Sequence, residues 1–236
     1  MEIKNQLQNH AIGRFTNNRT KTWILSPDIT LSGDKITHKN KTDFGTIDEI
    51  NRVITIDRRL ALESKGRRNP LLSHTALVPN CTYKITDADN VHWFMTDEQG
   101  RTIKTKHWVK DIYRQRLNDE QTKALMCKDE DTKPNTPREI NDEGGHILAD
   151  SAGGLPESIN IFPQAYRVNH SKEWRGLETQ IKNAILNGDN VHVETEFRYN
   201  DACKRPENYT YYLTVNGSQS RHAFDNRNLT LDELKI

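Results

Sequence analysis

The sequence predicts an α+β fold in which an antiparallel sheet packs against one main helix. Two segments near the C-terminus, residues 191–198 and 208–215, are rich in β-branched and aromatic residues, and the first alternates apolar with polar positions as a half-buried strand does. Upstream of them, apolar residues recur at steps of three and four from Trp174 to Ile185, the spacing of a buried helical face. We therefore expect a helix over about 172–187, resting on a sheet.

The composition limits the classes of protein that the chain can belong to. Of its 236 residues, 33% are hydrophobic and 28% are charged, and the formal net charge is +1. The chain can bury a core, but any basic surface for nucleic acid must be local. The three cysteines form no CxxC pair, which argues against a structural zinc site. No apolar run approaches the ~20 residues of a membrane span, and the polar start does not resemble a signal peptide.

The N-terminal region, residues 1–70, is predicted to be a loosely packed leader or linker. A capping-box pattern begins at Thr46 and predicts a helix over about 47–64. The residues that share one face of this helix are Ile47, Ile50 and Ile54. The run VITI at 53–56 could equally sit in a strand.

From Leu71 the sequence turns to strands. The stretches VHWFMT and RTIKTKHW are joined across residues 97–100, whose turn chemistry suits a hairpin. This part holds the most basic window of the chain, formed by Arg101, Lys104, Lys106, Lys110, Arg114 and Arg116. Trp93 and Trp108 flank the window, so it could be a nucleic-acid face with aromatic neighbours or a solvated amphipathic edge.

The remaining predicted boundaries come from residues that favour turns and loops. Residues 117–141 are acidic and then proline-containing, and are predicted to form a surface loop. Asn187-Gly188 ends the predicted helix. Asn216-Gly217 is a strong hairpin signal leading to a last short strand near Arg221–Phe224, and the polar tail 227–236 is expected to be peripheral.

The candidate catalytic and metal-binding residues lie within residues 142–178. His146 follows a glycine pair, so a substrate can approach a side chain suited to take a proton from water near neutral pH. Asparagine carbonyls such as those of Asn160 and Asn169 are hard oxygen ligands that suit Mg²⁺. A base beside such an ion indicates phosphodiester hydrolysis. The residues alone also allow a plainer interpretation, with a structural histidine in a glycine-rich turn and Glu178 in an ordinary ion pair.

The ordered motifs of this stretch resemble the DNA/RNA non-specific endonuclease family of the ββα-metal (His-Me finger) superfamily, in its bacterial toxin-domain branch. The matching motifs are Gly145-His146, Asn160-Ile161-Phe162-Pro163-Gln164, Asn169, and Trp174 followed by Glu178. The resemblance covers about residues 71–226 and implies an α+β nuclease domain with a ββα-metal core and one active-site helix.

The resemblance also implies roles for individual residues. His146 would be the general base, Asn169 the direct ligand of one Mg²⁺, with Mn²⁺ as a substitute, and Glu178 would hold the ion through water. Asn160 would fix the loop or the substrate phosphate, and Gln164 would support the site or the substrate. Because the interval from Asn169 to Trp174 is one residue longer than the usual pattern, His170 could intrude at the ligand position.

One position departs from the family motif, Asp-Arg-Gly-His. Gly144 stands where the motif has arginine, and either Asp142 or Glu143 can stand for the aspartate. The cation that faces the substrate must then come from elsewhere. The candidates are Arg175, Lys182 and Arg205.

These features together predict a Mg²⁺-dependent, sequence-tolerant endonuclease acting on DNA and RNA. The resemblance further implies a toxic effector of a bacterial antagonism system, secreted or delivered by a specialised secretion system into a target-cell cytoplasm and neutralised by an immunity protein. The alternative is a catalytically inactive relative that only binds nucleic acid or a protein partner.

Overall fold

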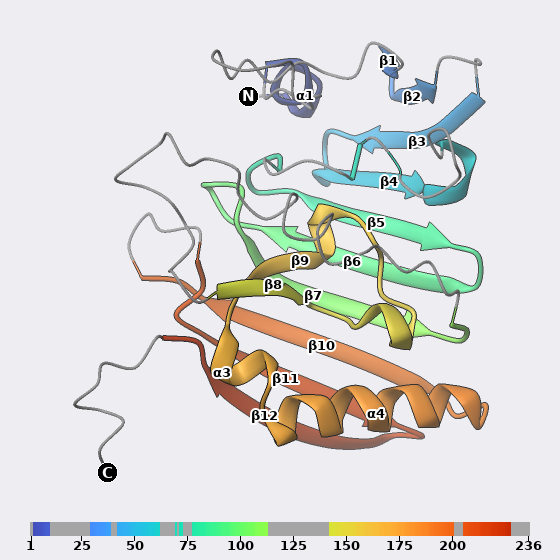
Figure 1. The fold of residues 1–236 in the computed structure, drawn as a ribbon. Helices are drawn as coiled ribbons and strands as arrows, with labels where there is room; N and C mark the ends of the chain where they lie inside the picture. The colour runs from blue at the N-terminus through green and yellow to red at the C-terminus, as the bar shows by residue number, and fades with distance from the viewer. Residues whose placement is uncertain are drawn as a thin grey trace.

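The computed structural model describes residues 2–9, 29–38, 42–61, 69, 71–72, 77–112, 142–200 and 205–227. Its framework is one ten-stranded sheet in the order β1-β2-β3-β4-β5-β6-β7-β10-β11-β12 (Figure 1). All neighbouring strands are antiparallel except β4 and β5, which run parallel. The strands are β1 (Ile29–Ser32), β2 (Lys35–His38), β3 (Thr42–Asp48), β4 (Val53–Asp57), β5 (Thr82–Asp87), β6 (Asn90–Thr96), β7 (Thr102–Val109), β10 (Val191–Arg198), β11 (Asn208–Val215) and β12 (Ser218–Asp225).

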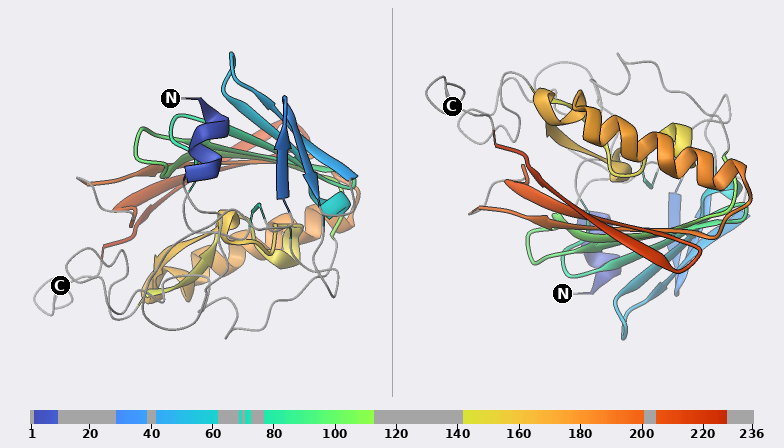
Figure 2. Two further views of the ribbon diagram at one scale, coloured as in Figure 1. Left: turned by 90° about the horizontal axis from the view of Figure 1, so that it is seen from above. Right: turned by 90° about the horizontal axis from the view of Figure 1, so that it is seen from below.

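A second layer lies on one face of this sheet (Figure 2). It contains a two-stranded hairpin and two helices: β8 (Asp142–His146), β9 (Ile161–Ala165), α3 (Tyr166–Asn169) and α4 (Lys172–Leu186). The shorter elements are α1 (Ile3–Asn9), η1 (Arg58–Ala61), η2 (Asp150–Ala152) and η3 (Ser158–Asn160). No described helix is long and apolar enough to cross a membrane.

Aromatic side chains join the two layers. Trp174 of α4 makes edge contacts with Tyr209, Tyr211 and Phe224, which face it from β11 and β12. Phe162 of β9 packs in the same way on Phe197 and Tyr209, and all of these side chains are buried. Burial of such large rings dominates the energetics of a core, so this cluster fixes the hairpin and the helix on the sheet.

Several predicted elements are confirmed. The helix expected over 172–187 is α4, and the strands at 191–198 and 208–215 are β10 and β11. Asn216 and Gly217 both have positive φ, as the β11–β12 turn requires. Strand β12 begins at Ser218 and is longer than the short strand predicted near Arg221–Phe224.

The predicted helix over 47–64 is wrong. Its described residues, 47–61, contain the end of β3, then β4 and η1, and residues 62–64 lie outside the described residues. Ile47 and Ile54 face each other as a buried cross-strand pair, while Ile50 lies in the turn between the strands and is 93% exposed. The spacing that suggested a helical face therefore arises from two strand residues and a turn residue. Pairing of VITI with β5 on its other side gives these β-branched residues a place in the sheet interior.

The boundary predicted at residue 70 lies within one continuous sheet. Strands β1 to β4 come from the proposed leader, and β4 bonds directly to β5 of the proposed nuclease domain. The predicted loop over 117–141 lies outside the described residues, as do Cys127 and Cys203. Cys81 is a buried free thiol.

Candidate active site

His146 is the last residue of β8 and pairs with Ile161 of β9. The residue is partly buried, and loss of solvent around the ring lowers the pKa of His146 to about 4. Burial penalises the imidazolium, so the ring is neutral near pH 7 and has a lone pair that can accept a proton. None of the described residues forms a hydrogen bond with this ring.

The hairpin is closely packed beneath Gly145. A Cβ atom at this glycine would lie 2.3 Å from Oε1 and 2.6 Å from Cβ of Gln164, so no larger residue fits. Gln164 is fully buried, and its Nε2 donates to the Tyr209 hydroxyl at 2.6 Å. This placement gives Gln164 a supporting role under the His146 strand and keeps it away from a substrate. Tyr209 was not anticipated, because it lies 45 residues away from Gln164 in sequence.

Asn160 holds the loop that follows His146. Its Oδ1 accepts from the Leu148 backbone N–H at 3.1 Å, and its Nδ2 donates to the carbonyls of Leu148 and Leu155 at 2.9 and 2.8 Å. The side chain is fully buried. Of the two roles that the sequence left open for Asn160, this geometry supports fixing the loop.

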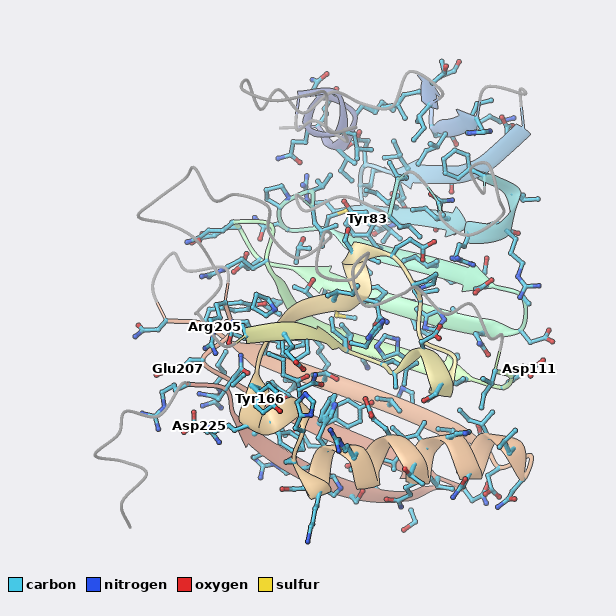
Figure 3. All side chains as sticks on the ribbon, in the orientation of Figure 1. Tyr83, Asp111, Tyr166, Arg205, Glu207 and Asp225 are labelled. Atoms are coloured by element: carbon cyan, nitrogen blue, oxygen red, sulfur yellow. The ribbon has the colours of Figure 1, made fainter. Side chains whose placement is uncertain are left out.

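The two acids of the DEGGH stretch lie in different surroundings. Asp142 is buried and accepts two hydrogen bonds from Arg205, at 2.6 and 2.7 Å (Figure 3). Glu143 instead faces α3, where its Oε2 accepts from Asn169. Glu143 is therefore the acid that lies beside Asn169. Arg205 is 7% exposed and forms an ion pair with Asp142. A buried, paired guanidinium does not fit the predicted contact with substrate.

Asn169 and His170 meet at this glutamate. Asn169, the last residue of α3, donates from Nδ2 to Glu143 Oε2 at 2.6 Å. The Nε2 atom of His170 lies 2.8 Å from the same oxygen, and the guanidinium of Arg175 bonds to Nδ1 of His170. The Tyr166 ring stacks on His170 from the other side.

Glu178 lies one turn after Trp174 on α4, at the edge of the buried helical face. Loss of solvent raises the pKa of Glu178, and the nearby Trp174 indole and Arg175 lower it in part. The indole N–H points to the carboxylate without forming a full hydrogen bond. Lys182 follows one turn later and is partly buried, whereas Arg175 is exposed. The helix thus presents Arg175, Glu178 and Lys182 along one edge.

Comparison with known proteins identifies the family of the chain. Residues 79–217, more than half of the chain, match the DNA/RNA non-specific endonuclease family. The chain belongs to this family. Members of this class hydrolyse nucleic-acid phosphodiester bonds, and the matched region contains His146, Asn169 and Glu178.

The chain is also similar to two relatives and one solved structure. It is 32% identical over 78 residues to "Probable deoxyribonuclease RhsA" of Dickeya dadantii (strain 3937), a match covering 33% of this chain and 5% of that protein. It is 25% identical over 141 residues to "Type VII secretion system protein EssD" of Staphylococcus aureus (strain USA300), covering 55% and 20%. The chain thus spans a small part of either relative's length. NucA from Streptococcus agalactiae, solved with no metal bound, matches 67% of this chain and 78% of its own at 13% identity and a TM-score of 0.43.

The oxygen donors of this endonuclease domain suit a hard divalent cation. Nucleases of the family generally depend on a metal ion. Asn169 binds Glu143 through its amide nitrogen, which leaves its carbonyl oxygen available, and Glu178 adds a partly buried carboxylate. Over the described ranges, no three His, Cys, Asp or Glu side chains gather into a metal-binding group.

The basic window predicted around Trp108 lies on the other face of the sheet. Along β7 the buried residues face the hairpin layer, whereas Lys104, Lys106 and Trp108 alternate with them and face away. The two lysines pair with Glu194 of β10. Of the two predicted interpretations, a nucleic-acid face with aromatic neighbours or a solvated amphipathic edge, the ion pairs with β10 favour the second for Lys104 and Lys106. Arg114 and Arg116 lie outside the described residues.

Proposed function

We propose that this domain cleaves DNA and RNA by Mg²⁺-dependent hydrolysis of phosphodiester bonds, with His146 as the general base. The observation that carries the proposal is the neutral His146 at the end of β8, in the same layer as Asn169 and Glu178. In this view β8, β9 and α4 are the ββα-metal core of the domain. A water molecule beside His146 loses its proton to the ring as it attacks the phosphorus.

The remaining residues hold the reactants. Asn169, through its carbonyl oxygen, and Glu178, through water, would hold Mg²⁺, or Mn²⁺ in its place. The ion offsets negative charge on the phosphate and on the leaving oxygen. Arg175 and Lys182, on the edge of α4, contact the substrate phosphates. Asn160 keeps the loop after His146 in place. Phosphate contacts carry no base information, so cleavage is expected to tolerate any sequence.

A cleavage assay tests this proposal. Plasmid DNA and a structured RNA are incubated with the protein in Mg²⁺, Mn²⁺ or EDTA. Wild type cuts both in either metal, and His146→Ala is slower by about 10²- to 10⁴-fold because a positioned base contributes that much. His192→Ala is the matched control, since His192 lies beside Trp108 on the far face of the sheet. Intact substrates in Mg²⁺, or equal rates for wild type and His146→Ala, would sink the proposal.

The second candidate function is a binding module without catalysis. Gly144 favours it, because this position lacks the arginine of the family motif. Such a module retards nucleic acid in a gel with or without chelator and breaks no phosphodiester bond. The cleavage assay therefore separates the two functions directly.

We also propose that the chain is the toxic part of a bacterial antagonism system. The support is its similarity to a probable deoxyribonuclease, RhsA, and to a type VII secretion system protein, EssD. The effector would be delivered by a specialised secretion system into a target-cell cytoplasm, and an immunity protein would neutralise it. Expression in a bacterial cytosol should stop growth for wild type and not for His146→Ala. Normal growth with wild type at matched protein levels would contradict this role.

A further inference from the structure

The side chains of Asn169 and His170 converge on one oxygen atom of Glu143. Nδ2 of Asn169 lies 2.6 Å and Nε2 of His170 lies 2.8 Å from Oε2 of the glutamate. All three residues are partly exposed, so they lie at the surface of the site and not in the core. His170 directly follows Asn169, in the interval to Trp174 that is one residue longer than the family pattern.

The partners of His170 determine which ring nitrogen carries the proton. A guanidinium has only donors, so Nδ1 of His170 must accept the bond from Arg175. The ring proton then sits on Nε2, which donates to Glu143. Tyr166, which is labelled in Figure 3, stacks on the ring. The ring centroids are 4.1 Å apart and the planes are inclined by 21°. His170 is therefore held by Arg175, Tyr166 and Glu143 together.

The same glutamate determines how the Asn169 amide is oriented. A carboxylate oxygen only accepts hydrogen bonds, so the amide must turn its nitrogen toward Glu143 and its oxygen away. If the carboxylate rotated, the amide could rotate with it and present nitrogen where a cation needs oxygen. The bond from His170 removes this freedom, because it holds Oε2 from a second direction.

We propose that His170 is a positioning residue of the metal site. With Arg175 behind it, His170 fixes the Glu143 carboxylate, and Glu143 in turn presents the Asn169 carbonyl oxygen to a divalent cation. This inference rests on the proposed function only in taking Asn169 as the metal ligand. It assigns to Glu143, His170 and Arg175 a chain of contacts that orients the Asn169 ligand.

Direct metal binding tests the inference without relying on cleavage. Mn²⁺ is titrated into the protein, and the free ion is followed by electron paramagnetic resonance. His170→Ala should weaken Mn²⁺ binding about 10- to 100-fold, the usual effect of losing a residue that orients a metal ligand. His170→Gln, whose amide can still donate to Glu143, should recover most of the affinity, and His192→Ala should bind as wild type does. Circular dichroism confirms that each variant is folded.

A second measurement determines which nitrogen of the His170 ring carries the proton. In protein labelled with ¹⁵N-histidine, the His170 resonances should show the proton on Nε2 in wild type and a mixture of tautomers in Arg175→Ala. The inference is overturned if His170→Ala binds Mn²⁺ as tightly as wild type, if wild type binds no Mn²⁺, or if the wild-type ring is protonated on Nδ1. The proposed function fails on a different result, namely intact DNA and RNA with the metal-loaded wild type.

Discussion

At the residue scale, the strand that carries His146 is packed so closely that no larger side chain fits at Gly145. Gln164 fills the space beside Gly145, and its Nε2 reaches across to Tyr209. The glycine pair in the sequence suggested access for a substrate. The structure adds a second reason for Gly145, which is the close passage of Gln164 beneath it.

Gly145→Ala should therefore destabilise the domain by about 1–3 kcal/mol, the usual cost of forcing extra volume into a packed site. Cleavage should fall as well, because the shift moves the His146 strand. Urea unfolding and the plasmid assay measure the two effects. Gly176→Ala is the control, since nothing lies within 4 Å of a Cβ there and the helix gains up to ~1 kcal/mol. Equal stability of the two variants would refute the packing argument.

The ion pair between Arg205 and Asp142 gives a second prediction at this scale. Arg205→Met removes the two hydrogen bonds and leaves a buried carboxylate without this counter-charge. Losing one partner of a buried pair costs about 3–5 kcal/mol. We expect a large loss of stability measured by urea unfolding, with normal cleavage per folded molecule at low temperature.

The double variant Arg205→Met with Asp142→Leu should recover much of that stability, because an apolar pair can replace a buried ion pair. If Arg205→Met instead stays fully stable and loses cleavage, Arg205 contacts the substrate as the sequence suggested.

At the scale of elements, helix α4 is encoded locally. Its apolar residues recur at helical spacing, and Ser171 caps its first turn by accepting from the Trp174 backbone N–H at 3.1 Å. The first turn contains Trp174, which packs on the sheet, and Glu178 follows one turn later. The cap therefore supports both the helix and the carboxylate.

Ser171→Ala should lower the free energy of unfolding by about 1 kcal/mol, because it leaves an N–H at the helix start without its acceptor. Ser171→Asp should keep the stability, since aspartate also caps and its charge suits a helix N-terminus. Chemical denaturation of the three proteins measures the difference. Equal stability of Ser171→Ala and wild type would show that the cap contributes nothing.

The hairpin of β3 and β4 shows where local patterns mislead. Residues spaced three and four apart can lie on a helical face or on two paired strands around a turn. Ile47 and Ile54 take the second arrangement because β4 pairs with β3 on one side and with β5 on the other, and a local pattern does not encode the position of β5.

At the scale of the whole molecule, the sheet buries histidines beneath the layer that contains the site. Nδ1 of His92 on β6 lies 3.0 Å from Nδ1 of His107 on β7, and both side chains are fully buried. Burial lowers the pKa of His92 to about 4 and holds the pKa of His107 well below its usual range. The folded protein thus keeps both rings neutral.

This burial predicts sensitivity to acid. An unfolded chain takes up protons on these rings below pH ~6.5 and the folded chain does not, so stability is full above that pH and falls as the pH drops toward 4. His92 alone should account for about 2 kcal/mol between pH 7.5 and 5.0. Urea unfolding at both pH values measures the loss, which should be smaller in His92→Leu. Equal losses in wild type and variant would contradict the argument.

The C-terminal end of the sheet also supports the site. Asn226 is buried after β12, and its side chain accepts from the Ala165 N–H and donates to the carbonyls of Pro163 and Pro206. It thereby ties β9 to β12. The domain end predicted at residue 226 falls on this contact, although nothing in the local sequence distinguishes Asn226 from the polar tail that follows it.

The sequence by itself determined the features that depend on neighbouring residues. These are helix α4, strands β10 and β11, the Asn216-Gly217 turn and the ordered motifs that include His146, Asn169 and Glu178. The patterns that predict them are the helical or strand periodicity of apolar residues and the residue types that allow positive φ in a turn. Each pattern depends only on residues close together in the sequence.

Only the tertiary structure decided the features that join distant segments. It shows that Asp142 and Glu143 have different partners, because Asp142 pairs with Arg205, 63 residues away. It also shows that Trp108 lies on the face of the sheet opposite the hairpin. It also joined the proposed leader to the nuclease sheet. The physical reason is that a side chain's partner depends on which surfaces the whole core buries together, and the packing of distant segments sets those surfaces.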